Sequence, residues 1–549
     1  MSAHPDDPSD CVDLTNFDER DLARYRIEAR HETERWAALE PRRTYTTGRV
    51  RIVIQPVFDP DDPHENNVLY RWADRLHADT RPSVIREAIL FRTDEPVTLS
   101  EMRESERILR AKPYLYDARV LPRRLCGERL DIDVVARDVW TLLPEADFAR
   151  SGGDNSYGYG LTDTNLIGTG HTLSLFYEKD PDRDGTGVYY LDPNLRGSRV
   201  MLETLLENNS DGSRRLLALG QPFYSLDARR AWGLRGEEID LEQGLYRFGD
   251  KFAEFAQDYR SVGVLAGVSS GEHNGRTWRW LAGFDYEKRT FSPVQGEIPP
   301  NPLPQDRTLA YPWLGVASVE DRFLTSTDVD LIHRTEDLDL GRAYEAKLGY
   351  SSSAFGGVHD RLVFRGAYTD GVRREHHDLL FVRASLDGYW NFDSNRSEGV
   401  YAKAYAAYRQ QQAGHFGFAA TAEGVVAHNL FGDQQLLGGG DTGLRGYPSR
   451  YQWGNRSYLL TFEERYFSDL YIARIVRVGV AVFVDVGRTW FSGADGDGYG
   501  TLADAGVGFR FESTRTRQDR VLHVDFAFPL VDGPDVQSMQ ILLVVKQRL

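Results

Sequence analysis

The segment from Val478 to Gly487 alternates so regularly that it limits what this part of the chain can fold into. Successive side chains of a β-strand point to opposite faces, so alternate positions describe two surfaces. One face holds valine at positions 478, 480, 482, 484 and 486, and the other holds Gly479, Ala481, Phe483, Asp485 and Gly487. Such a strand fits a membrane barrel with lipid outside and water inside, and it equally fits a soluble sandwich with the two faces reversed.

The same alternation recurs from residue 150 to Leu549, where short apolar patterns are broken by Gly, Asn, Asp and Pro and no convincing helix is present. Length separates the two alternatives. At about 25 residues per strand with its connection, the region gives about 16 strands, an even number that suits a closed barrel. We therefore predict a mostly β protein with a transmembrane antiparallel β-barrel over residues 150–549. The polar segments 178–187 and 293–307 are then expected to be outer loops.

Composition narrows the possible classes further. The hydrophobic fraction is 41% and the mean hydropathy is −0.48, and the best apolar runs, 478–484 and 541–545, are far shorter than the about 20 residues of a spanning helix. A net charge of −17 argues against a general nucleic-acid binder, which needs a basic surface. Cys11 and Cys126 either form a disulfide or remain two free thiols, and no signal-peptide pattern opens the sequence.

Residues 1–43 form a charged N-terminal extension, expected to be helical or disordered, and residues 17–40 are a possible plug for the barrel. Residues 44–142 indicate a small α/β domain. A strand is expected at 50–54, helical patterns follow, and Thr98 with Glu101 forms a capping box before another helix. A late strand is expected at 130–134.

A glycine-rich loop around residues 431–456 contains the tetrapeptide Leu444-Arg445-Gly446-Tyr447. Arg445 can form a forked pair with a carboxylate, and Asp485 points into the barrel by the alternation of its strand. We therefore predict that these two residues lock the loop inside the lumen, flanked by Phe483 and Gly487. Glu463 and Arg465 share the inward face of the strand after the loop and are expected to be further partners.

No catalytic, cofactor or metal site emerges from the motifs. Residues 267–271 match GxSxG without the strand-to-helix context of a hydrolase, and the glycines at 438, 440 and 443 match GxGxxG without a βαβ unit. Asp180, Asp182 and Asp184 begin like a calcium loop, but Leu191 occupies the position of its closing acid. We expect a protein without enzymatic activity.

Together these motifs resemble the BamA/TamA-like outer-membrane assembly superfamily, also called the bacterial surface-antigen family. Residues 444–447 resemble its [LV]RG[FY] loop motif, residues 483–487 its FxDxG strand, and Glu463 with Arg465 its ExR motif. Residues 165–170 resemble its first-strand motif NLxGxG, residues 521–530 resemble its penultimate strand, and the helices within 84–120 resemble a polypeptide-transport-associated (POTRA) domain.

The resemblance implies one POTRA domain, a 16-stranded barrel and a location in the outer membrane of a Gram-negative-type bacterium. The implied function is insertion or translocation of polypeptides, with a dedicated two-partner-type translocator and a passive or lipid channel as alternatives. Expected partners are unfolded or secreted client polypeptides, outer-membrane lipids and possible accessory periplasmic subunits, with no nucleic acid. The sequence leaves the client and the direction of transport open.

Overall fold

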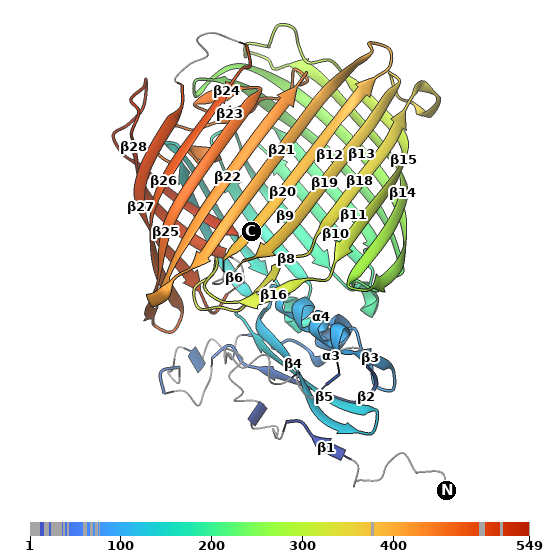
Figure 1. Ribbon diagram of the computed structural model, residues 1–549. Helices are drawn as coiled ribbons and strands as arrows, with labels where there is room; N and C mark the ends of the chain where they lie inside the picture. The colour runs from blue at the N-terminus through green and yellow to red at the C-terminus, as the bar shows by residue number, and fades with distance from the viewer. Residues whose placement is uncertain are drawn as a thin grey trace.

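The computed structural model describes residues 11–15, 21–22, 36, 39–40, 43–58, 63–65, 68, 70–71, 75, 77–374, 378–493, 500–516 and 520–547. It contains a β-barrel and a smaller N-terminal α/β domain below one barrel mouth (Figure 1). None of the helices in these ranges has the length and apolar character that crossing a membrane requires.

The barrel is closed, and its 20 described strands are each antiparallel to their neighbours. The strands are β6 (Leu142–Ser151), β7 (Asp154–Asp163), β8 (Thr172–Lys179), β9 (Asp184–Asp192), β10 (Met201–Asn209), β11 (Gly212–Gln221), β12 (Arg230–Arg247), β13 (Asp250–His273), β14 (Arg276–Pro293), β15 (Arg307–Glu320), β18 (Ala343–Ser351), β19 (Arg361–Arg373), β20 (Leu379–Asn391), β21 (Arg396–Gln411), β22 (Phe416–His428), β25 (Arg456–Ile472), β26 (Val476–Trp490), β27 (Leu502–Ser513), β28 (Arg520–Pro529) and β29 (Gln540–Gln547). The predicted class, a mostly β closed antiparallel barrel, is confirmed.

The predicted number of strands, about 16, is wrong because the connections are shorter than assumed. Residues 142–547 supply all 20 barrel strands, which is about 20 residues for each strand with its connection. The segment 178–187, expected to be an outer loop, lies mostly within β8 and β9 and leaves only a tight turn at 180–183. The other segment, 293–307, does contain a long loop, between β14 and β15.

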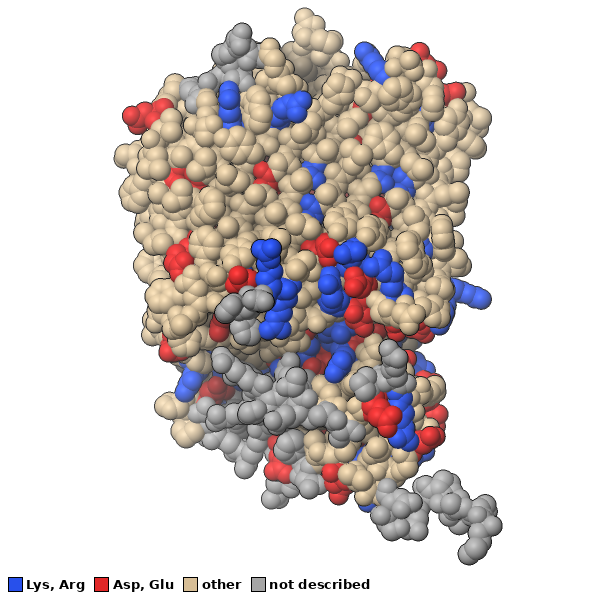
Figure 2. All heavy atoms as spheres, in the orientation of Figure 1, with Lys and Arg blue, Asp and Glu red and all other residues tan. Residues whose placement is uncertain are grey.

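The two faces of the barrel wall differ as the alternation of the strands predicts. On β26, Val482 is 53% exposed, whereas Phe483 and Asp485 are 3% and 0% exposed. On the face of the barrel that Figure 2 shows, charged side chains are scattered over the upper wall and are denser toward the end that meets the N-terminal domain. An apolar outer face suits contact with lipid, and the pairing of neighbouring strands satisfies the backbone groups along most of the wall.

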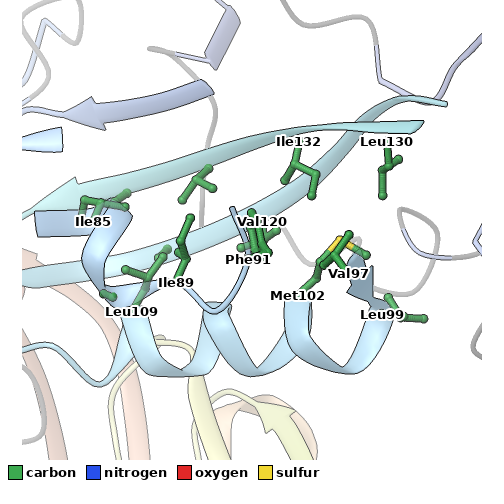
Figure 3. Packing of buried hydrophobic residues seen from close by; sticks show 14 of the residues in the cluster. Ile85, Ile89, Phe91, Val97, Leu99, Met102, Leu109, Val120, Leu130 and Ile132 are labelled. Carbon is green, nitrogen blue, oxygen red and sulfur yellow. The ribbon is translucent and has the colours of Figure 1, made fainter. Parts of the chain in front are cut away.

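The N-terminal domain has one mixed sheet in the order β1-β4-β5-β2-β3, covered by two helices. Its elements are β1 (Cys11–Asp13), β2 (Thr44–Gln55), α3 (Pro82–Ala88), β3 (Pro96–Thr98), α4 (Leu99–Arg110), β4 (Leu115–Cys126) and β5 (Arg129–Asp138). Helix α4 begins with the expected capping box between Thr98 and Glu101. Figure 3 shows Met102 and Leu109 of α4 packed beneath Val120 and Ile132 of the sheet.

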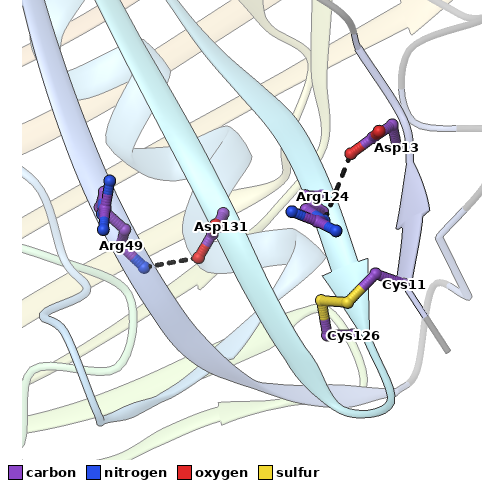
Figure 4. Close-up of a disulfide and its surroundings, with 6 residues drawn as sticks. All are labelled: Cys11, Asp13, Arg49, Arg124, Cys126 and Asp131. Carbon is purple, nitrogen blue, oxygen red and sulfur yellow. Dashed lines mark hydrogen bonds and ion pairs between the residues drawn. A yellow bond between two sulfur atoms is a disulfide. The ribbon is translucent and has the colours of Figure 1, made fainter. Parts of the chain in front are cut away.

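A disulfide between Cys11 and Cys126 joins β1 to β4 (Figure 4), so the two cysteines are not free. Described residues of the charged extension also belong to this domain. Leu22 packs against the sheet, and Trp36 and Leu39 enter the main core. These residues therefore do not plug the lumen, and most of the remainder of 17–40 lies outside the described residues.

Two similar turns at the lower barrel mouth hold the N-terminal domain. Asn165 and Asn194 occupy equivalent places, with φ of −145° and −143°, and each is followed by a left-handed residue, Ile167 or Arg196. The first turn accepts a hydrogen bond from the backbone N–H of Arg81, and Asn165 itself donates to Thr80. The motif at 165–170 therefore lies in the turn between the second and third barrel strands, and its expected place in the first strand is wrong.

The barrel closes through a weak seam. Strands β28 and β29 share eight aligned residue pairs, whereas β29 and β6 share one, Leu543 with Arg150. Since the ladder of hydrogen bonds holds neighbouring strands together, this junction is the easiest place in the described wall to separate.

Replacing Val507 by Arg tests which face of the barrel meets lipid. Val507 is 48% exposed on β27 and is aligned with the apolar residues Val482 and Phe526. We expect the charge to lower the free energy of unfolding by about 2–4 kcal/mol in lipid vesicles. The control is Asn208→Arg at the rim end of β10, for which we expect about 0–1 kcal/mol. Denaturant titration of tryptophan fluorescence measures both values, and equal small losses would contradict a lipid-facing Val507.

Candidate functional site

The connection between β22 and β25 folds back into the barrel from the mouth opposite the N-terminal domain (Figure 1). This inward loop, residues 429–455, contains the short strands β23 (Leu436–Gly438) and β24 (Gln452–Gly454), which pair with each other. Its tip, residues 440–447, faces the lumenal sides of β25 to β28 through the contacts given below. The loop therefore brings residues from the predicted motif to the inner wall.

Arg445 is the centre of a buried ionic cluster. Its Nε and Nη2 donate to the two carboxylate oxygens of Asp485 at 2.6 and 3.0 Å, which is the predicted forked arrangement. Its Nη1 donates to Glu463 at 2.9 Å and to Asp525 at 3.0 Å. The guanidinium also lies 3.3 Å from the ring centre of Phe483. Arg445 is 4% exposed, so acids on three strands compensate a charge that water barely reaches.

The residues beside Arg445 fix the loop by packing. Leu444 and Tyr447 are 3% and 0% exposed and belong to one apolar cluster, and the Tyr447 hydroxyl donates to the backbone carbonyl of Ala503 at 2.7 Å. Gly446 and Gly487 allow the close approach. A β-carbon on Gly446 would lie 2.7 Å from the β-carbon of Asp504, and one on Gly487 would lie 2.8 Å from a carbonyl oxygen of β25. A larger residue at Gly446 would push the tip off the wall, and one at Gly487 would crowd the backbone of β25 first and then Leu444, 3.3 Å away.

Arg465 extends the cluster toward the N-terminal domain. It donates to Glu463 at 3.0 Å and to Asp330 at 3.0 Å. Asp330 lies in the long connection between β15 and β18, and it also accepts a hydrogen bond from Arg409 of β21 at 2.9 Å. The predicted residues Glu463 and Arg465 thus adjoin Arg445, and they lead to an acid from another part of the chain.

That connection forms a hairpin of β16 (Phe323–Ser326) and β17 (Glu336–Asp339), whose tip, residues 327–335, enters the lower end of the lumen. Figure 1 places β16 beside α4. Val329, Leu331 and Ile332 of the tip are each less than 5% exposed. A cavity of about 390 Å³ lies beside the contact between Arg465 and Asp330, and both the tip and the Arg445 cluster line it.

The same hairpin is tied to the N-terminal domain. Both oxygens of Asp337 accept hydrogen bonds from Arg110 of α4 at 2.6 Å, and Thr335 donates to Asp117 of β4 at 2.8 Å. Next to this contact, Glu104 of α4 accepts a backbone hydrogen bond from Leu226 in the β11–β12 turn at 2.8 Å. Burial raises the pKa of Glu104 to about 6. The hairpin therefore touches α4 at its base and the ionic cluster at its tip.

Two more ion pairs hold the inward loop at its flanks. Asp433 forms a forked pair with Arg307 of β15, with both distances 2.7 Å. Arg450 pairs with Asp182 in the β8–β9 turn at 2.5 and 3.0 Å. In the strand order, Arg307 of β15 lies seven strands from β26 in one direction, and the β8–β9 turn lies six to seven strands away in the other. The loop therefore reaches across the lumen.

Two partners of the predicted lock were not found from the sequence. The alternation of β28 shows that Asp525 faces inward. It gives no reason to choose this acid as a partner of Arg445. Asp330 lies in an irregular connection, where alternation carries no information.

No family model matches the chain, and no curated protein matches it. Solved structures do resemble it at 12% identity. BamA from Haemophilus ducreyi lacking POTRA domains 1–3 has a TM-score of 0.38, with 91% of this chain and 85% of that chain covered. CdiB from Acinetobacter baumannii has a TM-score of 0.43, with 91% and 74% covered, and CdiB from Escherichia coli has 0.36, with 96% and 95% covered. Similarity at this level concerns the barrel fold alone.

Replacing Arg445 by Ala tests the ionic cluster. We expect the free energy of unfolding in lipid vesicles to fall by about 3–5 kcal/mol, because Asp485, Glu463 and Asp525 would keep their burial and lose their shared cation. Arg450→Ala in the same loop is the control. Its pair with Asp182 is partly exposed, so we expect a loss of about 1 kcal/mol or less. Equal losses in the two variants would contradict a buried lock at Arg445.

Proposed function

We propose that this protein is a non-enzymatic outer-membrane barrel that inserts or translocates polypeptides. The observation that carries the proposal is the continuous set of contacts from α4, through the β16–β17 hairpin, to the Arg445 cluster that holds the inward loop. A pore for passive diffusion needs neither a loop fixed across its lumen nor a domain connected to that loop. A machine that opens when a client arrives needs both.

The outer-membrane location rests on the barrel itself. A closed barrel and a helix are the only structures that satisfy every backbone hydrogen bond within lipid, and this chain has the apolar outer wall of the first kind. Barrels with an even number of antiparallel strands are typical of bacterial outer membranes. In this arrangement the N-terminal domain lies in the periplasm, and outer-membrane lipids surround the wall.

We further propose that the N-terminal domain acts as a POTRA domain and captures extended clients. Strand β3 pairs only with residues 44–46 of β2, so it covers one end of that side of the strand. An extended polypeptide can add to such an edge through its backbone, so the interaction tolerates many sequences. Captured clients would then lie below the barrel mouth that the N-terminal domain faces.

Photo-crosslinking from the β2 edge tests client capture. A photoreactive residue in place of Arg49, which is exposed on β2, should form adducts with polypeptides in living cells. The control is the same residue in place of Arg103, which is exposed on the helix α4 and offers no strand edge; we expect at least severalfold fewer adducts there. Adducts with many outer-membrane precursors indicate insertion, and adducts with one secreted protein indicate a dedicated translocator. Equal yields at the two positions would contradict capture at the edge.

Liposome swelling tests the alternative of a passive channel. Vesicles containing the full chain should swell in sugar solutions at nearly the rate of empty vesicles, because the inward loop crosses the lumen. Replacing residues 433–452 by a short flexible linker removes the Arg307, Arg445 and Arg450 anchors together, and swelling should accelerate severalfold. Rapid swelling with the unmodified protein would favour a passive channel over the proposed function.

A further inference from the structure

Three metal-ligating side chains meet at the lower rim of the barrel, outside the cluster around Arg445. They are His333 in the tip of the β16–β17 hairpin, His415 in the β21–β22 turn and Asp469 at the lower end of β25. One ligand atom from each lies within 4.8 Å of the other two. His333 Nε2 is 3.6 Å from one oxygen of Asp469, and His415 Nε2 is 4.0 Å from the other.

These separations are close to those of a formed metal site. Zinc bonds of about 2.0–2.1 Å at tetrahedral angles place two ligand atoms about 3.4 Å apart. The three groups therefore need to approach by less than about 1 Å for most pairs, which rotation of exposed side chains can supply. His415 and Asp469 have side-chain exposures of 44% and 79%, so an ion can enter from solvent.

The second ring nitrogen of His333 is already held as in a metal site. Its Nδ1 lies 3.0 Å from one oxygen of Asp328 and 3.2 Å from the other. Its Nε2 faces Asp469 at 3.6 Å and the backbone carbonyl of Ser468 at 3.3 Å, and a bound ion would replace the contact with that carbonyl. Metal-binding histidines usually donate their other ring N–H to a carboxylate in this way, because the contact fixes the tautomer and the ring orientation. The backbone N–H of His333 also donates to Asp328 at 2.5 Å, so the two residues form one rigid unit.

The backbone at this place is unusual as well. Asp328, His333 and His415 have φ of 58°, 51° and 66°, in the left-handed region that most residues other than glycine avoid. Two of the three ligand-bearing residues and the orienting acid therefore adopt a costly conformation in two separate turns. Such conformations persist where the surrounding contacts impose them and concentrate at functional sites.

We propose that His333, His415 and Asp469 bind a divalent transition-metal ion of the zinc type, with Asp328 as the positioning residue for His333. Two imidazoles and one carboxylate suit zinc and its neighbours in the first transition row and suit calcium or magnesium poorly. Three protein ligands leave one tetrahedral position for water.

The ion would fasten the hairpin to the barrel wall. His333 belongs to the element that contacts both α4 and the Arg445 cluster, whereas His415 and Asp469 belong to the wall. Arg477 of β26 already donates to the carbonyl of Ile332 at 2.6 Å, so the metal would add a second tie on the same side of the tip. Metal occupancy would thereby limit the movement of the hairpin, and this inference does not depend on the nature of the transported molecule.

The test is Co²⁺ and Zn²⁺ binding to the purified full chain in detergent, without an affinity tag. We expect one equivalent of Co²⁺ to give the visible absorption of a tetrahedral site and one equivalent of Zn²⁺ to displace it. The double variant His333→Ala with His415→Ala should lose the absorption. Asp328→Asn retains all three ligands and should weaken binding about 10- to 100-fold.

The matched control is His359→Ala, because His359 pairs with a single acid, Asp393, at 2.9 Å near the opposite mouth. This variant should bind one equivalent with unchanged affinity. Heat denaturation should show that the double variant remains folded, and Zn²⁺ should raise the denaturation temperature of the wild type and leave that of the double variant unchanged. Absence of binding to the wild type, or equal binding to the folded double variant, would overturn the proposal.

Discussion

The structure depends on one buried guanidinium and the acids around it. A charge taken out of water is costly unless it is paired and its hydrogen bonds are satisfied. Arg445 meets this condition only where Asp485 of β26, Glu463 of β25 and Asp525 of β28 converge. The ion pairs therefore form only when the loop lies in this position and the three strands keep this register. A shift of the loop, or of one strand by a single residue, would leave at least one charge buried without its partner.

The Arg445 cluster is also one end of a longer physical connection. Arg465 joins Glu463 to Asp330, and the hairpin that carries Asp330 rests on Arg110 and Asp117 of the N-terminal domain. Coupling between distant sites requires an element that contacts both and has more than one position. The hairpin meets the first condition through these contacts. A displaced N-terminal domain would pull on the hairpin, and the hairpin would then withdraw Asp330 from Arg465.

The sequence predicted the features that follow from strict alternation. The valine face of β26 and the inward directions of Asp485, Glu463 and Arg465 follow from counting positions along single strands. The pairing of Arg445 with Asp485 was predicted from the glycine-rich loop, the forked geometry of an arginine–carboxylate pair and the family resemblance. Features that lie outside the alternating strand patterns could not be predicted in this way. The strand number depended on connection lengths, which vary from two residues between β6 and β7 to a whole hairpin between β15 and β18. Asp330 and His333 lie in that hairpin, and only the folded chain brings them beside Arg465 and His415.

A double-mutant cycle between Arg445 and Asp485 tests the central claim most directly. Unfolding free energies in lipid vesicles are measured for wild type, Arg445→Ala, Asp485→Ala and the double variant, so that effects unrelated to their contact cancel. The forked bond predicts a coupling energy of about 2–3 kcal/mol, at the upper end of values for contacting residues. A coupling energy within about 0.5 kcal/mol of zero, the range for independent sites, would contradict the account.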